Sequence, residues 1–254
     1  MAGKHLAIQL ADHSARFVVL KNDIILNGRD LVFKSTSEDQ KKKELHDYFE
    51  STSFLNEDFD EVTLAWSTKK STLVPNNIFS ESDPISIFEL CYGKQESNDS
   101  IDYNRISELS IINIFEIPIW IKRFFVVKFP RIVIQHEGTH VLRSVMHQDT
   151  FRAKATVVLH KNYFQLTIVK HNNLEFYSFF DYQTHEDVLY HLLFTLQQKE
   201  LTSEKGFLEF VSGADADSSI LSDLEDDFIK IKDIEQLQMR VPIEFISKAQ
   251  LLCV

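Results

Sequence analysis

The stretch ATVVLHKNYFQLTIVKHNNLEFYSFF, residues 155–180, decides the fold. It contains three runs in which apolar side chains alternate with other residues, and short polar segments at 161–162 and 171–173 separate these runs. Alternation with a period of two predicts a strand with one buried face, and turns of two or three residues join antiparallel neighbours. Residues 155–180 therefore predict an antiparallel meander of three strands.

The residues after this meander complete a larger unit. Thr184 and Asp187 have the spacing of a capping box, in which two side chains bind the first N–H groups of a helix. A stripe of apolar residues at helical spacing follows over 188–196, residues 207–211 predict a strand, and residues 220–228 predict another helix. The predicted order is three strands, helix, strand, helix.

The first part of the chain predicts the same order of elements. The two repeats start near Leu6 and near Arg152, and they share little residue identity, so we interpret them as a structural repeat. The first repeat consists of a meander over 6–33, a helix from a Ser35/Glu38 capping box to about residue 50, a strand over 62–66 and a short helix after Asp83-Pro84.

A middle segment separates the two repeats, and we assign it to the first lobe. The last residues of the chain, 242–252, predict a helix. In the middle segment we expect a loop over 95–100, a strand over 111–115, a helix from Pro118 to Val127, a strand over 131–134 and a helix over 137–147. The lobes are therefore predicted at 1–149, including this inserted segment, and at 150–254.

Composition excludes several classes of function. The net charge of −11 repels nucleic acid and anionic lipid. No apolar run approaches the ~18 residues that a membrane-spanning helix needs, and the first residues do not resemble a signal peptide. Cys91 and Cys253 lie far apart and outside any CxxC motif, which argues against a disulfide framework. We expect a cytoplasmic protein with no nucleic-acid or membrane partner.

Short segments spread over most of the chain support a resemblance to a known family. These segments are Leu6–Leu10, Leu73–Pro75 with Phe79, Asn113–Pro118, Asp181–Thr184 and Glu186–Tyr190. On them the chain resembles an uncharacterised bacterial family, domain-of-unknown-function family 3822, which has the actin-like ATPase fold. The resemblance implies an α/β fold of tandem ribonuclease-H-like lobes, each built as β-β-β-α-β-α. It implies no function, because the family has no established activity.

The resemblance also indicates where a nucleotide would bind. In actin-like ATPases the first turn of each meander binds phosphate with the help of an Asp and a Gly, and a Gly-Gly element holds the adenosine. Here the turn Ala11–Ala15 contains Asp12 and Ser14 but no Gly, the turn 160–163 has neither acid nor Gly, and Gly213 alone stands at the adenosine element. Without glycines the cradle of backbone N–H groups around a phosphate is hard to form. Asp12, Ser14 and Gly213 are the candidate nucleotide-binding residues, and we expect no bound cofactor.

One catalytic motif occurs by letter, His136-Glu137-Gly138-Thr139-His140. On a helix, the histidines of an H-E-x-x-H motif face one way and bind zinc, while the Glu polarises a water molecule. Gly138 would cost such a helix ~1 kcal/mol relative to Ala, and the residues after Gln148 predict strands rather than a helix with a third ligand. We therefore predict no metal site and no catalytic residue here.

These observations rank three hypotheses. The first is a non-catalytic actin-like protein that acts through an unknown protein partner. The second is an ATP-binding or ATP-hydrolysing member of the same superfamily. The third is a zinc metallohydrolase that uses His136, Glu137 and His140. The missing glycines favour the first hypothesis, so we do not expect an enzyme.

Overall fold

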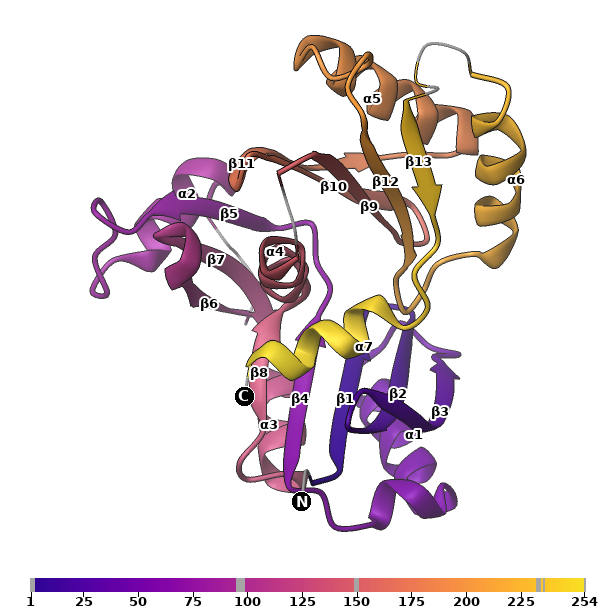
Figure 1. Ribbon diagram of the computed structural model, residues 1–254. Helices are drawn as coiled ribbons and strands as arrows, with labels where there is room; N and C mark the ends of the chain where they lie inside the picture. The colour runs from indigo at the N-terminus through magenta and orange to yellow at the C-terminus, as the bar shows by residue number, and fades with distance from the viewer. Residues whose placement is uncertain (1–2, 95–98, 149–150, 232–233, 235, 254) are drawn as a thin grey trace. The chain divides into compact units, whose positions relative to one another are not determined.

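The meander predicted over residues 155–180 is present in the structure. The structure is a computed structural model that describes residues 3–94, 99–148, 151–231, 234 and 236–253, and Figure 1 shows how their elements are arranged. Each strand of the meander is antiparallel to the next. The strands are β9 (Ala153–Leu159), β10 (Tyr163–Lys170) and β11 (Asn173–Asp181).

Two further strands extend this sheet by parallel pairing. β12 (Gly206–Ser212) is parallel to β9, and β13 (Leu237–Arg240) is parallel to β12. The strand order is β11-β10-β9-β12-β13. The predicted helices are α5 (His185–Gln198) and α6 (Ser218–Phe228), and their apolar faces pack on the sheet around Phe164 and Leu192. Sequence analysis missed β13, because a four-residue strand has too little alternation to be distinguished from a loop.

The first repeat forms a sheet with the same order, β3-β2-β1-β4-β8. β1 is antiparallel to β2 and parallel to β4, as β9 is to β10 and β12. The predicted repeat is therefore confirmed for its strands and its first helix. Its last helix is wrong in the first repeat, because the helix after Asp83-Pro84 packs through Phe88 on a separate sheet and residues 119–128 supply the helix on this one. The strands of this sheet are β1 (His5–Leu10), β2 (Ser14–Lys21), β3 (Ile24–Val32), β4 (Glu61–Trp66) and β8 (Val133–His136).

The inserted segment forms a separate three-stranded antiparallel sheet, β5-β7-β6. It extends over residues 71–118 and so begins earlier than the predicted start at residue 95. Of the predicted loop over 95–100, residues 95–98 lie outside the described residues, and residues 99 and 100 begin β6, so the prediction is wrong there. β6 has the polar sequence DSIDYNRI, which lacks the apolar alternation of a predicted strand. It pairs with β7 through main-chain hydrogen bonds, and these do not depend on the side chains. The segment contains β5 (Ser71–Pro75), α2 (Pro84–Tyr92), β6 (Asp99–Ile106), the short 3-10 helix η2 (Ser107–Leu109) and β7 (Ile111–Pro118).

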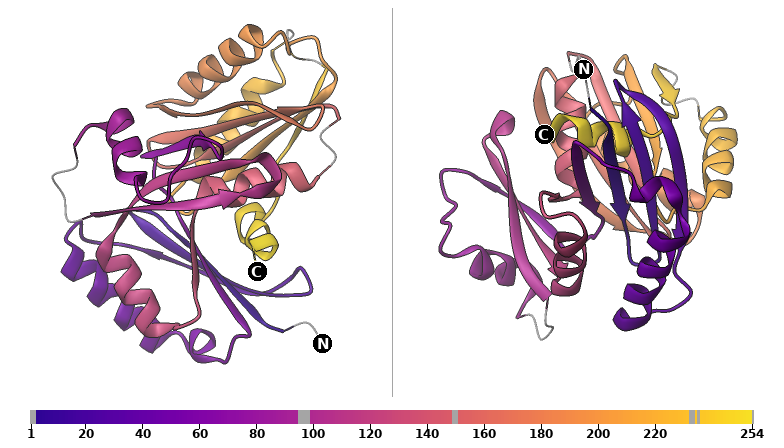
Figure 2. Two further views of the ribbon diagram at one scale, coloured as in Figure 1. Left: turned by 90° about the vertical axis from the view of Figure 1, so that its left-hand side faces the viewer. Right: turned by 90° about the horizontal axis from the view of Figure 1, so that it is seen from below.

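Helices cover both faces of the β3-β2-β1-β4-β8 sheet (Figures 1 and 2). On one face, Leu45 and Phe49 of α1 (Glu38–Ser51) and Phe125 of α3 (Ile119–Lys128) pack on the inward side chains of β1 and β2. A 3-10 turn, η1 (Ser53–Asn56), follows α1 and buries Leu55 in the same core. The opposite face is covered by the end of the chain, α7 (Phe245–Ala249) and η4 (Gln250–Cys253).

The chain end attaches to this sheet through buried polar contacts. The Gln9 Nε2 donates to the Ser247 Oγ at 2.7 Å, and the Thr63 Oγ1 donates to the Gln250 Oε1 at 2.6 Å. All four side chains are buried. The helix predicted over 242–252 is therefore present from Phe245, and hydrogen bonds as well as apolar burial hold it on the sheet.

The predicted helix starts have different outcomes. The Thr184/Asp187 capping box is confirmed, with both reciprocal hydrogen bonds present, and α2 begins at Pro84 as predicted. The Ser35/Glu38 capping box is wrong. The residue that caps α1 is Ser37, whose side chain makes no capping hydrogen bond. The Ser35 hydroxyl instead accepts the Ser37 N–H at 3.1 Å, within the turn that precedes the helix.

The chain divides into two compact units, residues 1–143 with 246–254, and residues 144–245. The division falls within the helix α4 (Glu137–His147). Its residues up to Arg143 belong to the first unit, and those from Ser144 belong to the second. The boundary predicted between residues 149 and 150 lies outside the described residues. None of the helices within the described ranges is long and apolar enough to cross a membrane.

Candidate functional site

The turn between β1 and β2 is closed by its own main chain. The Ala11 N–H donates to the Ser14 carbonyl at 2.9 Å, and the Phe33 N–H donates to the His13 carbonyl at 2.9 Å. The Asp12 side chain is 73% exposed, and its nearest cation is the Lys41 Nζ at 3.9 Å. Ser14 is the buried first residue of β2. This turn is a short hairpin connection with an exposed acid at its tip.

The corresponding turn of the second unit, between β9 and β10, is fixed by side chains. The His160 N–H donates to the Tyr163 carbonyl at 2.9 Å, and the rings of these two residues stack with their centroids 4.4 Å apart. The Tyr182 hydroxyl donates to the His160 carbonyl. The two hydrogen bonds hold the main chain of His160 in the turn, and the stacked Tyr163 ring covers its imidazole.

An acid from a distant part of the chain completes this turn. The Asp215 Oδ1 lies 2.8 Å from the His160 Nδ1, and the two side chains are only 6% and 1% exposed. Burial, followed by the negative charges of Asp215 and Asp217, raises the pKa of the Tyr182 hydroxyl to about 12. The turn that has no acid in its own sequence therefore contains a buried carboxylate. A phosphate entering it would meet a like charge in a place where water screens little.

Gly213 is needed for this packing. A Cβ at this position would lie 2.6 Å from the His160 Cε1 and 2.7 Å from the Leu159 carbonyl oxygen. The Gly213 N–H donates to that same carbonyl at 2.8 Å. The glycine that the sequence offered for adenosine binding thus allows the close approach of the β12 end to His160. Asp12 and Ser14 share the turn of the first unit, whereas Gly213 belongs to the second unit.

The H-E-x-x-H motif is part of a buried network in the first unit. His136 is the last residue of β8, and α4 begins only at Glu137, so the two histidines do not lie on one helix. The His136 Nδ1 accepts the Gly138 N–H at 3.0 Å, which leaves the proton on Nε2, and this nitrogen donates to the Thr68 carbonyl at 2.8 Å. Both ring nitrogens that could bind zinc are therefore engaged with the protein.

The other members of the motif are equally buried. The Glu137 Oε2 accepts the Ser67 hydroxyl at 2.6 Å, and the His140 side chain is fully buried. Burial first, and then the positive charge of Arg143, lower the pKa of His140 to about 3. The helix predicted over 137–147 is confirmed as α4. The zinc hypothesis needs both histidines on one helix face, and this is not the case because the strand β8 continues through His136. The residues join β8 and α4 to the inserted sheet through Asn104 and Asn113.

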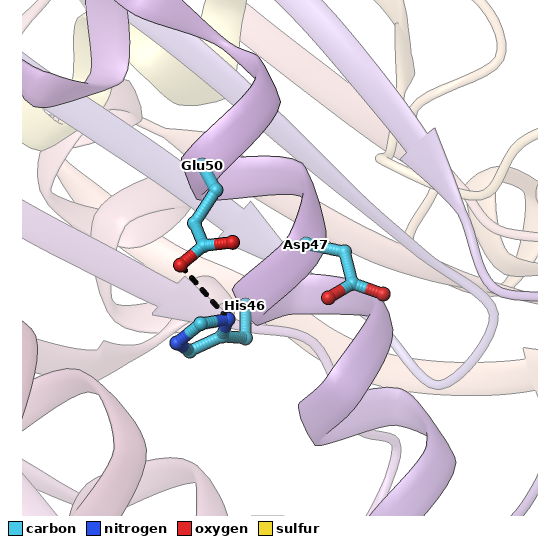
Figure 3. A group of neighbouring side chains, drawn as sticks. All are labelled: His46, Asp47 and Glu50. Carbon is cyan, nitrogen blue, oxygen red and sulfur yellow. Dashed lines mark ion pairs between the residues drawn. The ribbon is translucent and has the colours of Figure 1, made fainter.

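One exposed group on α1 has the residue types of a metal site (Figure 3). His46, Asp47 and Glu50 present ligand atoms that lie within 4.8 Å of one another. The His46 Nδ1 is already paired with the Glu50 Oε1 at 3.7 Å, and all three side chains are exposed on a single helix. Exposed acidic clusters of this kind are common without an ion, so we assign no metal to it.

Sequence reasoning missed the His160–Asp215 pair, and no local signal could have revealed it. The two residues are 55 positions apart, and each stands in an ordinary polar turn. Their proximity follows from the parallel pairing of β9 with β12, which brings the ends of the two strands to the same edge of the sheet.

Comparisons with known proteins show which family and fold these features belong to. The model of a family described as "Protein of unknown function (DUF3822)" matches residues 1–231. Among solved structures, the chain is similar to a protein from Bacteroides thetaiotaomicron with an actin-like ATPase fold and unknown function. That match has a TM-score of 0.76 and 20% identity, and covers 99% of this chain and 96% of the other.

A second similar structure is a chain of the PilM–PilN type IV pilus biogenesis complex, with a TM-score of 0.58 and 10% identity over 95% of this chain and 89% of that one. The search of curated proteins found no match. Likeness at these identities shows the fold, and the predicted actin-like ATPase fold is confirmed. The family match extends over most of the chain, so this protein belongs to the family of proteins of unknown function DUF3822.

Proposed function

We propose that this protein is a non-catalytic member of the actin-like ATPase fold that acts by binding another protein. The observation that supports the proposal best is the buried pair of His160 and Asp215 in the turn of the second unit. A turn that binds phosphate offers backbone N–H groups and no competing anion. This one has a carboxylate in its interior.

The main-chain donors of both turns support the same conclusion. The N–H groups of Ala11, His160 and Gly213 each donate to a carbonyl of the protein itself. A phosphate that displaced these carbonyls would leave main-chain acceptors without partners, at a cost of roughly 1–3 kcal/mol for each buried group. The glycine positions that would relieve this competition are absent from both hairpin turns.

A role in protein binding agrees with how a relative of the same fold is used. A chain of the PilM–PilN complex shares this fold, and that complex joins two proteins. The present chain has the same two-repeat architecture, and its surfaces are available for binding a partner protein.

Titration calorimetry with ATP and Mg²⁺ tests the proposal. We expect no binding heat at millimolar ATP, either for the unmodified protein or for the Asp12→Ala variant. Micromolar binding that Asp12→Ala abolishes would establish the ATP-binding alternative instead.

A second measurement addresses the partner. Affinity purification from the native cells, with quantitative mass spectrometry, is expected to recover the same protein in near-stoichiometric amounts across several growth conditions. Recovery of background proteins alone would contradict a role in protein binding.

A further inference from the structure

A groove of about 960 Å³ lies between α1 and α3, both of which belong to the first unit. Its apolar lining includes Phe49, Trp120, Phe124 and Val127. Phe49 is almost fully buried and its ring lies 6.2 Å from that of Phe124, so the floor of the groove is anchored in the core of the unit. Val127 is 84% exposed at the rim. An exposed rim over an aromatic floor is typical of a surface that binds another apolar group.

The charged residues around the groove are not balanced. Its lining has three cations, Lys42, Arg123 and Lys128, against the two carboxylates of Glu38 and Glu50. Lys42 pairs with Glu38 at 3.9 Å and with Asp39 at 3.1 Å. Arg123 is exposed and forms no ion pair with any residue that the structure describes.

Lys128, at the end of α3, is a second cation of the groove lining that has no carboxylate partner among the described residues. Its Nζ donates to the Asn56 side-chain oxygen at 3.3 Å and lies 5.1 Å from the centre of the Phe49 ring. Arg123 and Lys128 therefore give this groove an excess of positive charge, in a protein whose net charge is −11.

We propose that the groove between α1 and α3 binds an amphipathic, acidic helix of a partner protein. This inference rests on the proposed function, and it assigns the place and the chemistry of the partner. Apolar side chains of the bound helix at i, i+3 or i+4, and i+7 contact Phe49, Trp120 and Phe124. Its carboxylates pair with Arg123 and Lys128.

The length of α3 agrees with such a helix. α3 has 10 residues and is therefore about 15 Å long, which matches roughly three turns of a partner helix lying beside it. The acidic remainder of the chain repels an acidic segment, so the two cations determine where it docks.

Site-specific photo-crosslinking in the native cells tests the place and the occupant together. Val127→p-benzoylphenylalanine puts the crosslinker in the groove. Val126→p-benzoylphenylalanine is the matched control, because Val126 is 47% exposed on the same helix and does not line the groove. We expect the Val127 variant, and not the control, to capture a segment of another protein that has apolar residues at helical spacing and a net negative charge.

Each other outcome of this experiment overturns the proposal. The proposal is wrong if the captured segment is basic or extended, or if it belongs to a second copy of this chain. It is also wrong if both variants capture equally or if neither captures anything. The results of the ATP titration and of the affinity purification do not depend on this crosslinking experiment. A partner that binds elsewhere on the protein would still be recovered by affinity purification. The groove and the proposed function can therefore fail separately.

The captured segment, made as a labelled peptide, then tests the role of charge by fluorescence polarisation. Arg123→Glu is expected to weaken binding about tenfold or more, because it replaces an attraction with a repulsion. Lys43→Glu makes the same charge change at an exposed position of α1 outside the groove, and we expect its affinity to change less than about twofold. Equal losses in the two variants would show that net charge, rather than the groove, determines binding.

Discussion

Lowering the pH from 8 to 5 is expected to destabilise the protein through His140. In the unfolded chain a His has a pKa near 6.5, whereas burial and the charge of Arg143 lower the pKa of the folded His140 to about 3. Below pH 6.5 the unfolded state therefore binds a proton that the folded state does not accept. The contribution of His140 to stability is complete above pH 6.5 and is lost progressively as the pH falls toward 3.

The magnitude follows from the separation of the two pKa values. Each pH unit between them changes the free energy of unfolding by about 1.4 kcal/mol, so a change from pH 8 to pH 5 removes about 2 kcal/mol. Urea unfolding at the two pH values, followed by tryptophan fluorescence, measures this loss.

The variant His140→Gln isolates the contribution of this one side chain. It lowers stability at both pH values, because it alters a buried position, but we expect its loss between pH 8 and pH 5 to be about 2 kcal/mol smaller than that of the unmodified protein. His46→Gln, at an exposed position, is the matched control for the replacement of a histidine by glutamine. An unchanged pH dependence in His140→Gln would refute the buried, neutral state of His140.

Three further predictions concern packing and hydrogen bonds, and each is checked by urea unfolding. Gly213→Ala is expected to destabilise the protein by roughly 1–3 kcal/mol, because the new methyl group overlaps the His160 ring and the Leu159 carbonyl; full stability would contradict the close approach. Thr184→Ala removes the side chain that caps α5, with an expected loss of about 1 kcal/mol, and a loss confined to Asp187→Ala would show that only half of the capping box matters. Ser247→Ala deprives the buried Gln9 Nε2 of its acceptor at 2.7 Å and is expected to cost about 1–3 kcal/mol; no loss would mean that apolar burial alone holds the chain end.

Features that depend only on neighbouring residues could be predicted from the sequence. Alternation in the stretch 155–180 is a consequence of the pleat of a strand, so the meander could be predicted without knowledge of any other part of the chain. The Thr184/Asp187 capping box is equally local. Because the strand signals and the first helix occur in the same order twice, they were sufficient for the repeat of the two sheets and, with the family resemblance, for the actin-like fold. They did not identify α3 as the second helix of the first repeat, because that choice depends on packing.

Features that join distant segments could be seen only after the chain had folded. Main-chain hydrogen bonds pair β6 with β7 whatever side chains β6 carries, so the inserted sheet left little trace in the residue pattern. The H-E-x-x-H motif has the right letters, but parallel pairing of β8 with β4 keeps His136 extended and places it among buried partners.

The candidate site shows the same division. The absence of glycine from the two hairpin turns could be read from the sequence, and it indicated a closed nucleotide site. What closes the second turn could not be read, because Asp215 reaches His160 only through the parallel alignment of β9 and β12. The groove beside Trp120 depends on α1 and α3 packing on one face of a sheet. The sequence determined which segments form strands and helices, and the packing of these elements decided which side chains meet, since contacts between distant residues depend on the position of the whole element.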